Sequence, residues 1–244
     1  MKYIFAAAQG KAMTYGKNAA HIGYELDTQG RLVQKGIPEN TRGGLMVLTL
    51  SKGNLRSPQD SAEEILLEMA ERNYSGIIAD TECGYDKSAE QLLRRLEKAD
   101  TALYVEKAYA KSVNTAMVMI SSAVRSGSFD AMLSEAIMEY GARAVLQLER
   151  LCQSCPLPCR DGLGKKLTLR ERAALQRETG SQGFFSPKLI TNYFTYYDRD
   201  KKAHFVLYDT SSSVKRKLEL AAQRGINIAV AVPEEFEDIL NEIW

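Results

Sequence analysis

The sequence lacks most of the signatures that assign a chain of 244 residues to a protein class. Its apolar runs stop short of the ~18 residues that a membrane-spanning helix needs. The phosphate-binding loops GxGxxG and GxxxxGK[ST] are missing, and so is the GxSxG turn of a nucleophilic serine. Basic residues are scattered and the formal net charge is +1, so we expect neither nucleic acid nor a membrane as a partner. Residues 1–10 fit a first strand better than a signal peptide, so the protein is expected in the cytoplasm, or secreted if a leader has been removed.

Cysteine is scarce as well. Four cysteines are too few for a disulfide scaffold. Three of them form the tight run Cys152-x-x-Cys155-x-x-x-Cys159, which could bind zinc or an iron–sulfur cluster with Cys83 as a fourth ligand. Because the run does not match a standard cluster spacing, a chance cluster or a loop disulfide is the preferred interpretation. We predict no metal and no cofactor, and keep a metal-dependent barrel as a minor alternative.

Strand-like apolar runs alternate with helix-like segments along almost the whole chain. The pair Ser57-Pro58 marks the start of one helix, with proline in its first turn. Three further starts have capping-box spacing: Ser61 with Glu64, Ser88 with Gln91, and Thr168 with Glu171. The expected strands are residues 3–8, 21–26, 45–50, 76–80, 102–106, 116–121, 144–148, 204–208 and 226–232.

This alternation of strands and helices predicts a parallel sheet. Eight or nine strand candidates favour a closed (β/α)8 barrel, a TIM-barrel-like α/β fold, over an open doubly wound sheet. We predict that residues 1–244 form one such barrel domain. The longest irregular stretch is Cys152–Lys166, and a long loop after a strand is often functional.

The most informative segment is Tyr74–Glu82, a short apolar strand that ends in two acids. Side chains alternate faces along a strand, so Asp80 and Glu82 should point the same way, with Cα atoms roughly 6.5–7 Å apart. The carboxyl ends of strands are where α/β proteins place their chemistry. Two carboxylates this close resist ionising together, which raises the pKa of one and suits it to act as an acid near neutral pH. Two solvated surface acids are the alternative interpretation.

The same segment resembles the signature strand of glycoside hydrolase family 18, the chitinase-like barrels. That signature is D-G-x-D-x-D-x-E. Gly76, Asp80 and Glu82 match its glycine, its last aspartate and its glutamate, whereas Ser75 and Ile78 replace its first two aspartates. Other segments are similar to family motifs in the same order along the chain: 21–32 to the second strand and its turn, 44–53 to the third strand, 205–217 to the motif before the last helix, and 222–226 to the step into the eighth strand.

The resemblance implies a glycoside hydrolase that acts on β-linked N-acetylhexosamine glycans. In that family the glutamate protonates the glycosidic oxygen and the substrate's own acetamido group attacks the sugar carbon, so no enzyme nucleophile is required. Glu82 would be the general acid/base, and Asp80 would orient the acetamido group. Tyr24 and Glu25, near the end of the second strand, are candidate substrate-binding residues.

Several departures from the family pattern weaken this implication. Ile78 cannot share a proton with Asp80, as the middle aspartate of the signature does. The resemblance places Leu146–Glu149 where the family has a tyrosine on its sixth strand; this segment offers Gln147 and Glu149 as substrate-binding candidates instead. The tryptophan that floors the sugar site is absent from the eighth strand, since the only tryptophan is Trp244. A non-catalytic glycan-binding or structural barrel is therefore the alternative function.

Two other groups are interpreted mainly as structural. His21 and His204 fall in different expected strands with no nucleophile motif beside them. The aromatic cluster Tyr193–Tyr197 is expected to pack in the core, with a sugar-stacking wall as the alternative.

Overall fold

The computed structural model describes residues 1–8, 10–27, 29–50, 57–81, 84–158 and 164–244. They form two compact units. The first contains residues 1–120, 139–147 and 226–234, and the second contains residues 121–138, 148–225 and 235–244. Within the described residues, no helix has the length and apolar character to cross a membrane.

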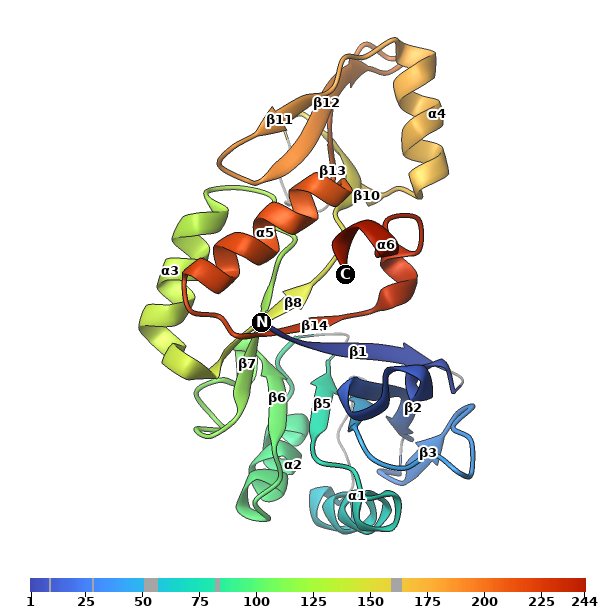
Figure 1. Ribbon diagram of the computed structural model, residues 1–244, viewed down its shortest axis with the longest axis vertical. Helices are drawn as coiled ribbons and strands as arrows, with labels where there is room; N and C mark the ends of the chain where they lie inside the picture. Colours follow the sequence, from blue (N-terminus) through green and yellow to red (C-terminus); the bar gives the residue numbers. More distant parts are fainter. Residues whose placement is uncertain (9, 28, 51–56, 82–83, 159–163) are drawn as a thin grey trace. The chain divides into compact units, whose positions relative to one another are not determined.

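Eight strands of the first unit form a closed barrel (Figure 1). The strand β1 pairs in parallel with both β2 and β14, which joins the two ends of the sheet. The predicted (β/α)8 barrel is confirmed. In order around the barrel its strands are β1 (Lys2–Ala8), β2 (Ala19–Leu26), β4 (Leu45–Thr49), β5 (Ile77–Asp80), β6 (Leu103–Glu106), β7 (Met117–Ser121), β8 (Ala144–Leu148) and β14 (Ile228–Ala231). A short strand, β3 (Leu32–Gln34), adds antiparallel to β2.

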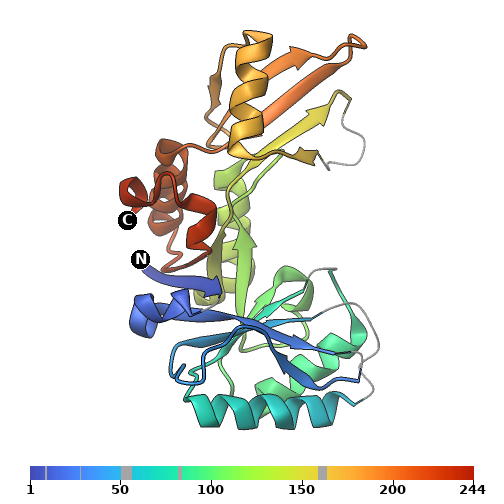
Figure 2. The same cartoon turned by 90° about the vertical axis from the view of Figure 1, so that its right-hand side faces the viewer.

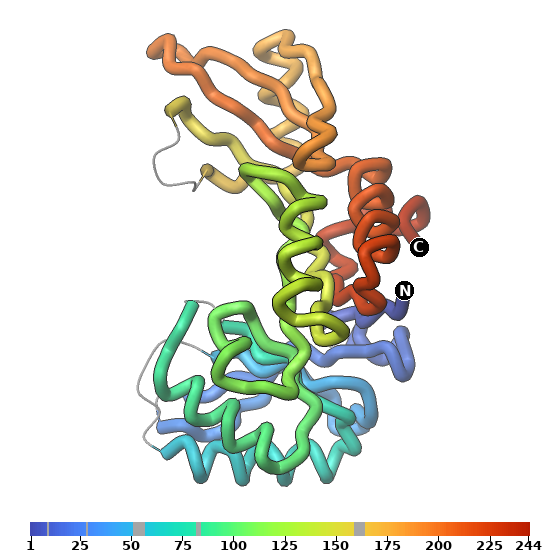
Figure 3. Tube along the Cα trace, turned by 90° about the vertical axis from the view of Figure 1, so that its left-hand side faces the viewer, coloured from blue at the N-terminus to red at the C-terminus, as the bar shows by residue number. Residues whose placement is uncertain are grey.

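Alternate residues of the barrel strands point to opposite faces, and both faces are apolar. Inside the barrel, Val47, Ile78 and Tyr104 pack with side chains from the other strands. On the outside, Met46 and Leu48 pack against helices. Two of these helices, α1 (Pro58–Arg72) and α2 (Lys87–Lys98), run side by side (Figure 3).

Local sequence signals fix where several helices begin. Ser57 caps α1 by accepting a hydrogen bond from the backbone N–H of Asp60, as the Ser57-Pro58 pair predicts. In α2 the cap is Asp86 rather than the predicted Ser88. Short 3-10 helices replace several barrel helices or follow their ends: η1 (Lys11–Asn18), η2 (Lys107–Tyr109), η3 (Gly141–Arg143) and η4 (Pro233–Phe236).

A β-bulge at Gly23 changes which side chains of β2 face the barrel interior. The register against β4 shifts between Ile22 and Tyr24. Gly23 has φ +143°, and a Cβ there would lie 2.4 Å from the carbonyl oxygen of Lys35, so the bulge requires glycine. Ile22 packs inside the barrel, whereas Tyr24 packs outside it. Glu25 consequently falls on the inner face.

The second unit contains a five-stranded antiparallel sheet. Its strands in spatial order are β10 (Lys165–Lys166), β9 (Cys152–Pro156), β13 (Ala203–Tyr208), β12 (Thr191–Tyr197) and β11 (Phe184–Ser186). The helix α4 (Leu169–Thr179) lies beside the sheet (Figure 2). Three more helices lie wholly or mostly in the second unit: α3 (Phe129–Tyr140), α5 (Ser211–Gln223) and α6 (Leu240–Ile243).

This sheet corrects two predictions. Residues 204–208 are a strand, but they pair in the second sheet and not in the barrel. The stretch Cys152–Lys166, predicted to be irregular, contains β9 and β10. The prediction that residues 1–244 form a single barrel domain made no allowance for a second sheet.

A buried charge network anchors α5 to the strand before it. The ammonium of Lys217 lies 2.9 and 2.8 Å from the two carboxylate oxygens of Asp209. Neither residue is more than 2% exposed. The hydroxyls of Thr191 and Ser213 and the backbone N–H of Leu151 also donate to Asp209, so both of its carboxylate oxygens accept several hydrogen bonds.

Candidate active site

Polar side chains gather where the barrel strands end. Glu25 pairs with Thr49 across β2 and β4, and Thr49 pairs with Asp80 across β4 and β5. Thr49 and Asp80 share the inner face with Val47 and Ile78, which lie two residues earlier on the same strands. The three residues therefore form a row on the inner face at the carboxyl edge of the barrel.

Asp80 ends β5 after the buried residues Ile77, Ile78 and Ala79, and it is exposed. Its backbone carbonyl accepts a hydrogen bond from Leu50 at 2.8 Å, which fixes the strand end against β4. The apolar strand with an acid at its end is thus present as predicted. Glu82, the predicted general acid/base, lies outside the described residues, as does Cys83.

The two substrate-binding candidates on β2, Tyr24 and Glu25, lie on opposite faces of the barrel wall. The carboxylate of Glu25 faces the inner side and forms an ion pair with Lys35 at 2.5 Å. Tyr24 is 1% exposed and packs in the outer layer. Its hydroxyl donates to Glu68 at 2.9 Å and lies 2.9 Å from the hydroxyl of Tyr74. Burial is the main cause that raises the pKa of Tyr24 far above its ordinary value.

Gln147 lies on β8, and Glu149 is the first residue after this strand. In chain order β8 is the seventh barrel strand, and the sixth is β7, so the segment does not occupy the position that the resemblance gave it. Gln147 is half-buried on the face of Val145, inside the barrel. Glu149 falls in the second unit, where its carboxylate accepts a hydrogen bond from the hydroxyl of Ser121 at 2.7 Å.

Glu106 is a candidate that sequence reasoning missed. It ends β6 two residues after Tyr104, whose ring lies inside the barrel, so Glu106 also falls on the inner face. Ile78 pairs with Tyr104, which places Asp80 and Glu106 at equivalent positions on neighbouring strands. The signal was available, because an acid at the end of an expected strand is the feature that identified Asp80.

The cysteines do not converge within the described residues. Cys152 and Cys155 are both buried on β9. They are three positions apart on one strand, so their side chains point to opposite faces. Burial raises the pKa of the Cys152 thiol, which disfavours the thiolate that a metal would bind. Cys159 and Cys83 lie outside the described residues, and among the remainder no three potential ligands come together.

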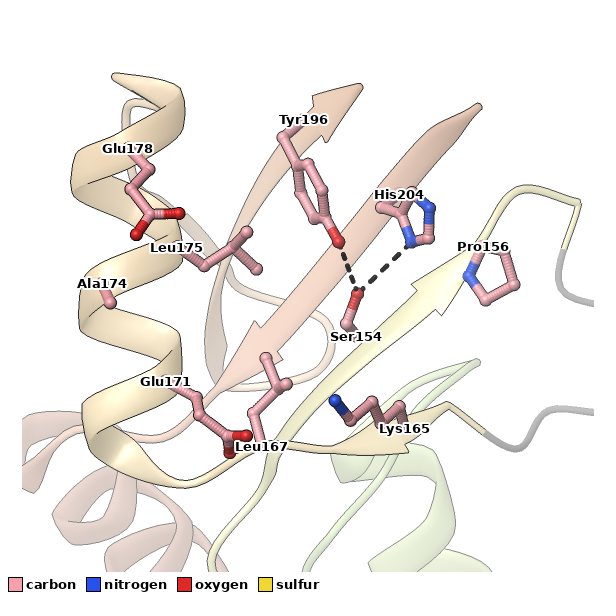
Figure 4. Close-up of a pocket in the computed structure, with 10 residues that line it drawn as sticks. All are labelled: Ser154, Pro156, Lys165, Leu167, Glu171, Ala174, Leu175, Glu178, Tyr196 and His204. Atoms are coloured by element: carbon pink, nitrogen blue, oxygen red, sulfur yellow. Dashed lines mark hydrogen bonds between the residues drawn. The ribbon is translucent and has the colours of Figure 1, made fainter. Parts of the chain in front are cut away.

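The two histidines lie in different units. His21 is 3% exposed, and its Nε2 lies 3.2 Å from the carbonyl oxygen of Gly43. Burial lowers the pKa of His21. His204 lines a pocket of the second sheet together with Ser154 and Tyr196 (Figure 4).

Comparisons with known proteins agree on the fold. No family model and no curated protein matches the sequence. Among solved structures, the spore cortex-lytic enzyme SleL of Bacillus megaterium QM B1551 is similar over 100% of this chain and 74% of its own, with 13% identity and a TM-score of 0.67. The chain has a chitinase-like barrel fold.

Two chitinases support the same conclusion. One from Chromobacterium violaceum ATCC 12472 has 15% identity and a TM-score of 0.63 over 98% of this chain and 97% of its own. A GH18 chitinase from Cycas revoluta, crystallised with (GlcNAc)3, has 11% identity and a TM-score of 0.61 over 99% of this chain and 98% of its own. In the barrel of this chain, the strand that ends in Asp80 is the fourth along the sequence.

Proposed function

We propose that the protein is a glycoside hydrolase that cleaves β-linked N-acetylhexosamine glycans. The observation that carries the proposal is Asp80, which lies exposed on the inner face at the carboxyl edge of a chitinase-like barrel. Structural neighbours with this fold include chitinases and a spore cortex-lytic enzyme, and one was crystallised with (GlcNAc)3. The proposed partner is therefore a glycan that contains N-acetylglucosamine.

In the proposed mechanism Glu82 donates a proton to the glycosidic oxygen. The carbonyl oxygen of the substrate's own acetamido group attacks the anomeric carbon as the bond to the leaving sugar breaks. Asp80 holds the acetamido group in line for this attack. Water then displaces the acetamido oxygen from the anomeric carbon, with Glu82 as the base that takes the water's proton. This step restores the acetamido group, and the configuration is retained.

The inner-face acids also suit the charge that develops during this reaction. The transition state resembles an oxocarbenium ion, and fixed negative groups near it are stabilising. Glu106 and Asp80 supply such groups from neighbouring strands. Glu25 forms an ion pair with Lys35, and its proposed role is to position substrate. Gln147, on the inner face of β8, is proposed to bond substrate, whereas Tyr24 is too buried to be included.

A non-catalytic glycan-binding barrel is the second candidate. It is favoured by Ile78, which packs inside the barrel where the signature has an acid, and by the absence of a tyrosine from β7 and of a tryptophan from β14. Such a protein would bind the same glycans without cleaving them.

Turnover of a chromogenic chitooligosaccharide tests the proposal. Glu82→Gln and Asp80→Asn should each lower kcat by about 10²–10⁴-fold, because each removes a group that acts on the reacting atoms. Glu71→Gln, on the exposed side of α1, is the matched control and should leave kcat unchanged. Full activity in Glu82→Gln would refute the assigned acid. If the unmodified protein binds the glycan but does not cleave it, the result supports the second candidate, a non-catalytic glycan-binding barrel.

A further inference from the structure

A pocket of about 400 Å³ lies between α4 and the five-stranded sheet (Figure 4). Its volume is within the range of small-ligand sites, about 300–1,000 Å³. Every residue that lines it belongs to the second unit. The floor comes from β9, β12 and β13, and the walls come from α4 and the chain that leads into it.

The floor of the pocket is polar because one face of the sheet changes character along its strands. Toward one end this face carries Cys152, Phe194 and Val206, which form the apolar core of the unit. Toward the other end the same face carries Ser154, Tyr196 and His204 (Figure 4). The apolar core therefore covers only one end of this face of the sheet. At the other end three side chains that can form hydrogen bonds line the pocket.

These three groups are held in place but are only loosely bonded to one another. The hydroxyl of Ser154 lies 3.4 Å from the hydroxyl of Tyr196 and 3.4 Å from Nδ1 of His204. Hydroxyl hydrogen bonds are usually about 2.7–2.8 Å long. The groups thus keep hydrogen-bonding capacity for a molecule in the pocket.

The ring of His204 has a fixed orientation. Its Nε2 lies 2.9 Å from a carboxylate oxygen of Asp198, and this contact is the main cause that lowers the pKa of Asp198. The other oxygen of Asp198 accepts the backbone N–H groups of Asp200 and Lys202. The ring of Tyr196 stacks on His204 at 4.8 Å between centroids, so Nδ1 stays directed at the pocket.

The walls combine apolar side chains with three charged ones, whose sum is slightly negative. Leu167 and Leu175 present hydrocarbon beside the polar floor. One lysine, Lys165, stands against two glutamates, Glu171 and Glu178, so the formal charge of these three is −1. The carboxylate of Glu171 is already engaged in capping α4 through Thr168, at 2.7 and 2.9 Å. This arrangement disfavours an anionic ligand.

We propose that this pocket binds a neutral saccharide, a mono- or disaccharide. A sugar hydroxyl both donates and accepts, and so do the hydroxyls of Ser154 and Tyr196. In a neutral imidazole whose Nε2–H donates to Asp198, Nδ1 is an acceptor that faces the pocket. The leucines match the C–H faces of a sugar ring. The proposal goes beyond the barrel chemistry and stands on the pocket itself, so it holds whether or not the barrel cleaves glycans.

The test is an NMR titration of the full chain in a Glu82→Gln background, with N-acetylglucosamine and its β-1,4-linked disaccharide as probes. Backbone amides of β9, β12 and β13 should shift and saturate. Tyr196→Phe and Ser154→Ala should each raise Kd by about three- to ten-fold, the effect of one lost hydrogen bond. Tyr193→Phe is the matched control, because Tyr193 lies on the opposite face of β12 and stacks on Phe205; its Kd should not change.

Three outcomes would overturn the proposal. Shifts confined to barrel residues would place the sugar elsewhere. Equal effects of Tyr196→Phe and Tyr193→Phe, in variants with unaltered thermal unfolding, would show that the pocket hydroxyl is not used. Tighter binding of glucuronic acid than of the neutral sugars would contradict the charge argument. Turnover of the chromogenic glycan by the unmodified protein is measured separately, so failure of the hydrolase proposal is distinguishable from failure of this one.

Discussion

At the scale of single residues, Tyr24 links two other polar side chains in the outer layer of the barrel, Glu68 and Tyr74. The hydroxyls of Tyr24 and Tyr74 meet at 2.9 Å, and Tyr24 also bonds Glu68. His21 lies beside this group, with its ring 5.5 Å from that of Tyr74. Because an imidazolium buried here would lose its hydration, His21 is held neutral, and folding is thereby linked to pH.

We expect His21 to make the protein less stable in acid. Burial holds its pKa below the ordinary value of 6.5 in the folded state. Below pH 6.5 the unfolded chain takes up a proton at this histidine that the folded protein does not. The free energy of unfolding therefore decreases as the pH is lowered, until the pKa of the folded state is reached. Above pH 6.5 both states are neutral at this site and its contribution is constant.

Urea unfolding of the unmodified protein and of His21→Gln between pH 7.5 and pH 5.5, roughly one unit above and below the ordinary histidine pKa, measures this effect. Glutamine keeps an N–H that can bond the carbonyl of Gly43 but does not titrate. The decline in free energy of unfolding should be shallower in the variant. Parallel curves would show that His21 does not carry the linkage.

At the scale of elements, the bulge in β2 decides which residues face the barrel. We predict that Gly23→Ala lowers the free energy of unfolding by about 1–3 kcal/mol or more, because the new Cβ would lie 2.4 Å from the carbonyl oxygen of Lys35 at a φ of +143°. Gly43→Ala is the matched control: φ is +73°, but nothing lies within 4 Å of its Cβ. Equal costs for the two variants would mean that the contact with Lys35 does not matter.

The same bulge shows why local pattern could not predict the whole site. A strict period of two places Ile22 and Tyr24 on one face, but the register shift turns Tyr24 outward and Glu25 inward. The end of β5 was predictable, since an apolar run that stops at Asp80 needs no partner to be recognised. Which residue of β2 joins Asp80 in the row on the inner face depends on how β2 pairs with β4, and the sequence of one strand does not contain this pairing.

Helix starts and strand pairing show the same contrast between local patterns, which the sequence predicts, and distant partners, which it does not. The capping box of Thr168 and Glu171 was predicted and is present in α4. Ser61 had the same spacing, yet it lies inside α1 and its hydroxyl donates to the carbonyl of Gly30. The strand character of residues 204–208 was likewise predicted, but their partners β9 and β12 were not, because alternation alone does not say which sheet a strand joins.

At the scale of the whole molecule, the two compact units differ in what holds them together. The first unit is a closed sheet with apolar side chains on both faces. The second contains Asp209 and Lys217, a charged pair that is buried and surrounded by hydrogen bonds. Removing one partner of such a pair leaves the other charge uncompensated, which costs about 3–5 kcal/mol.

Lys217→Met should therefore weaken the second unit by about 3–5 kcal/mol and leave the first largely intact. Hydrogen exchange followed by mass spectrometry measures this directly. Peptides of α5, β12 and β13 should lose protection, while those of β4, β5 and α1 should keep it. Lys215→Met, an exposed lysine on the same helix, is the control and should change neither set.

The double variant Asp209→Leu/Lys217→Met tests the physical cause. With both charges gone, no uncompensated charge remains, so its loss of stability should be smaller than the sum of the two single losses. Additive losses would mean that the pair contributes only packing. Equal deprotection of both units by Lys217→Met would mean that they unfold as one, because local unfolding free energies then equal the global value throughout the chain.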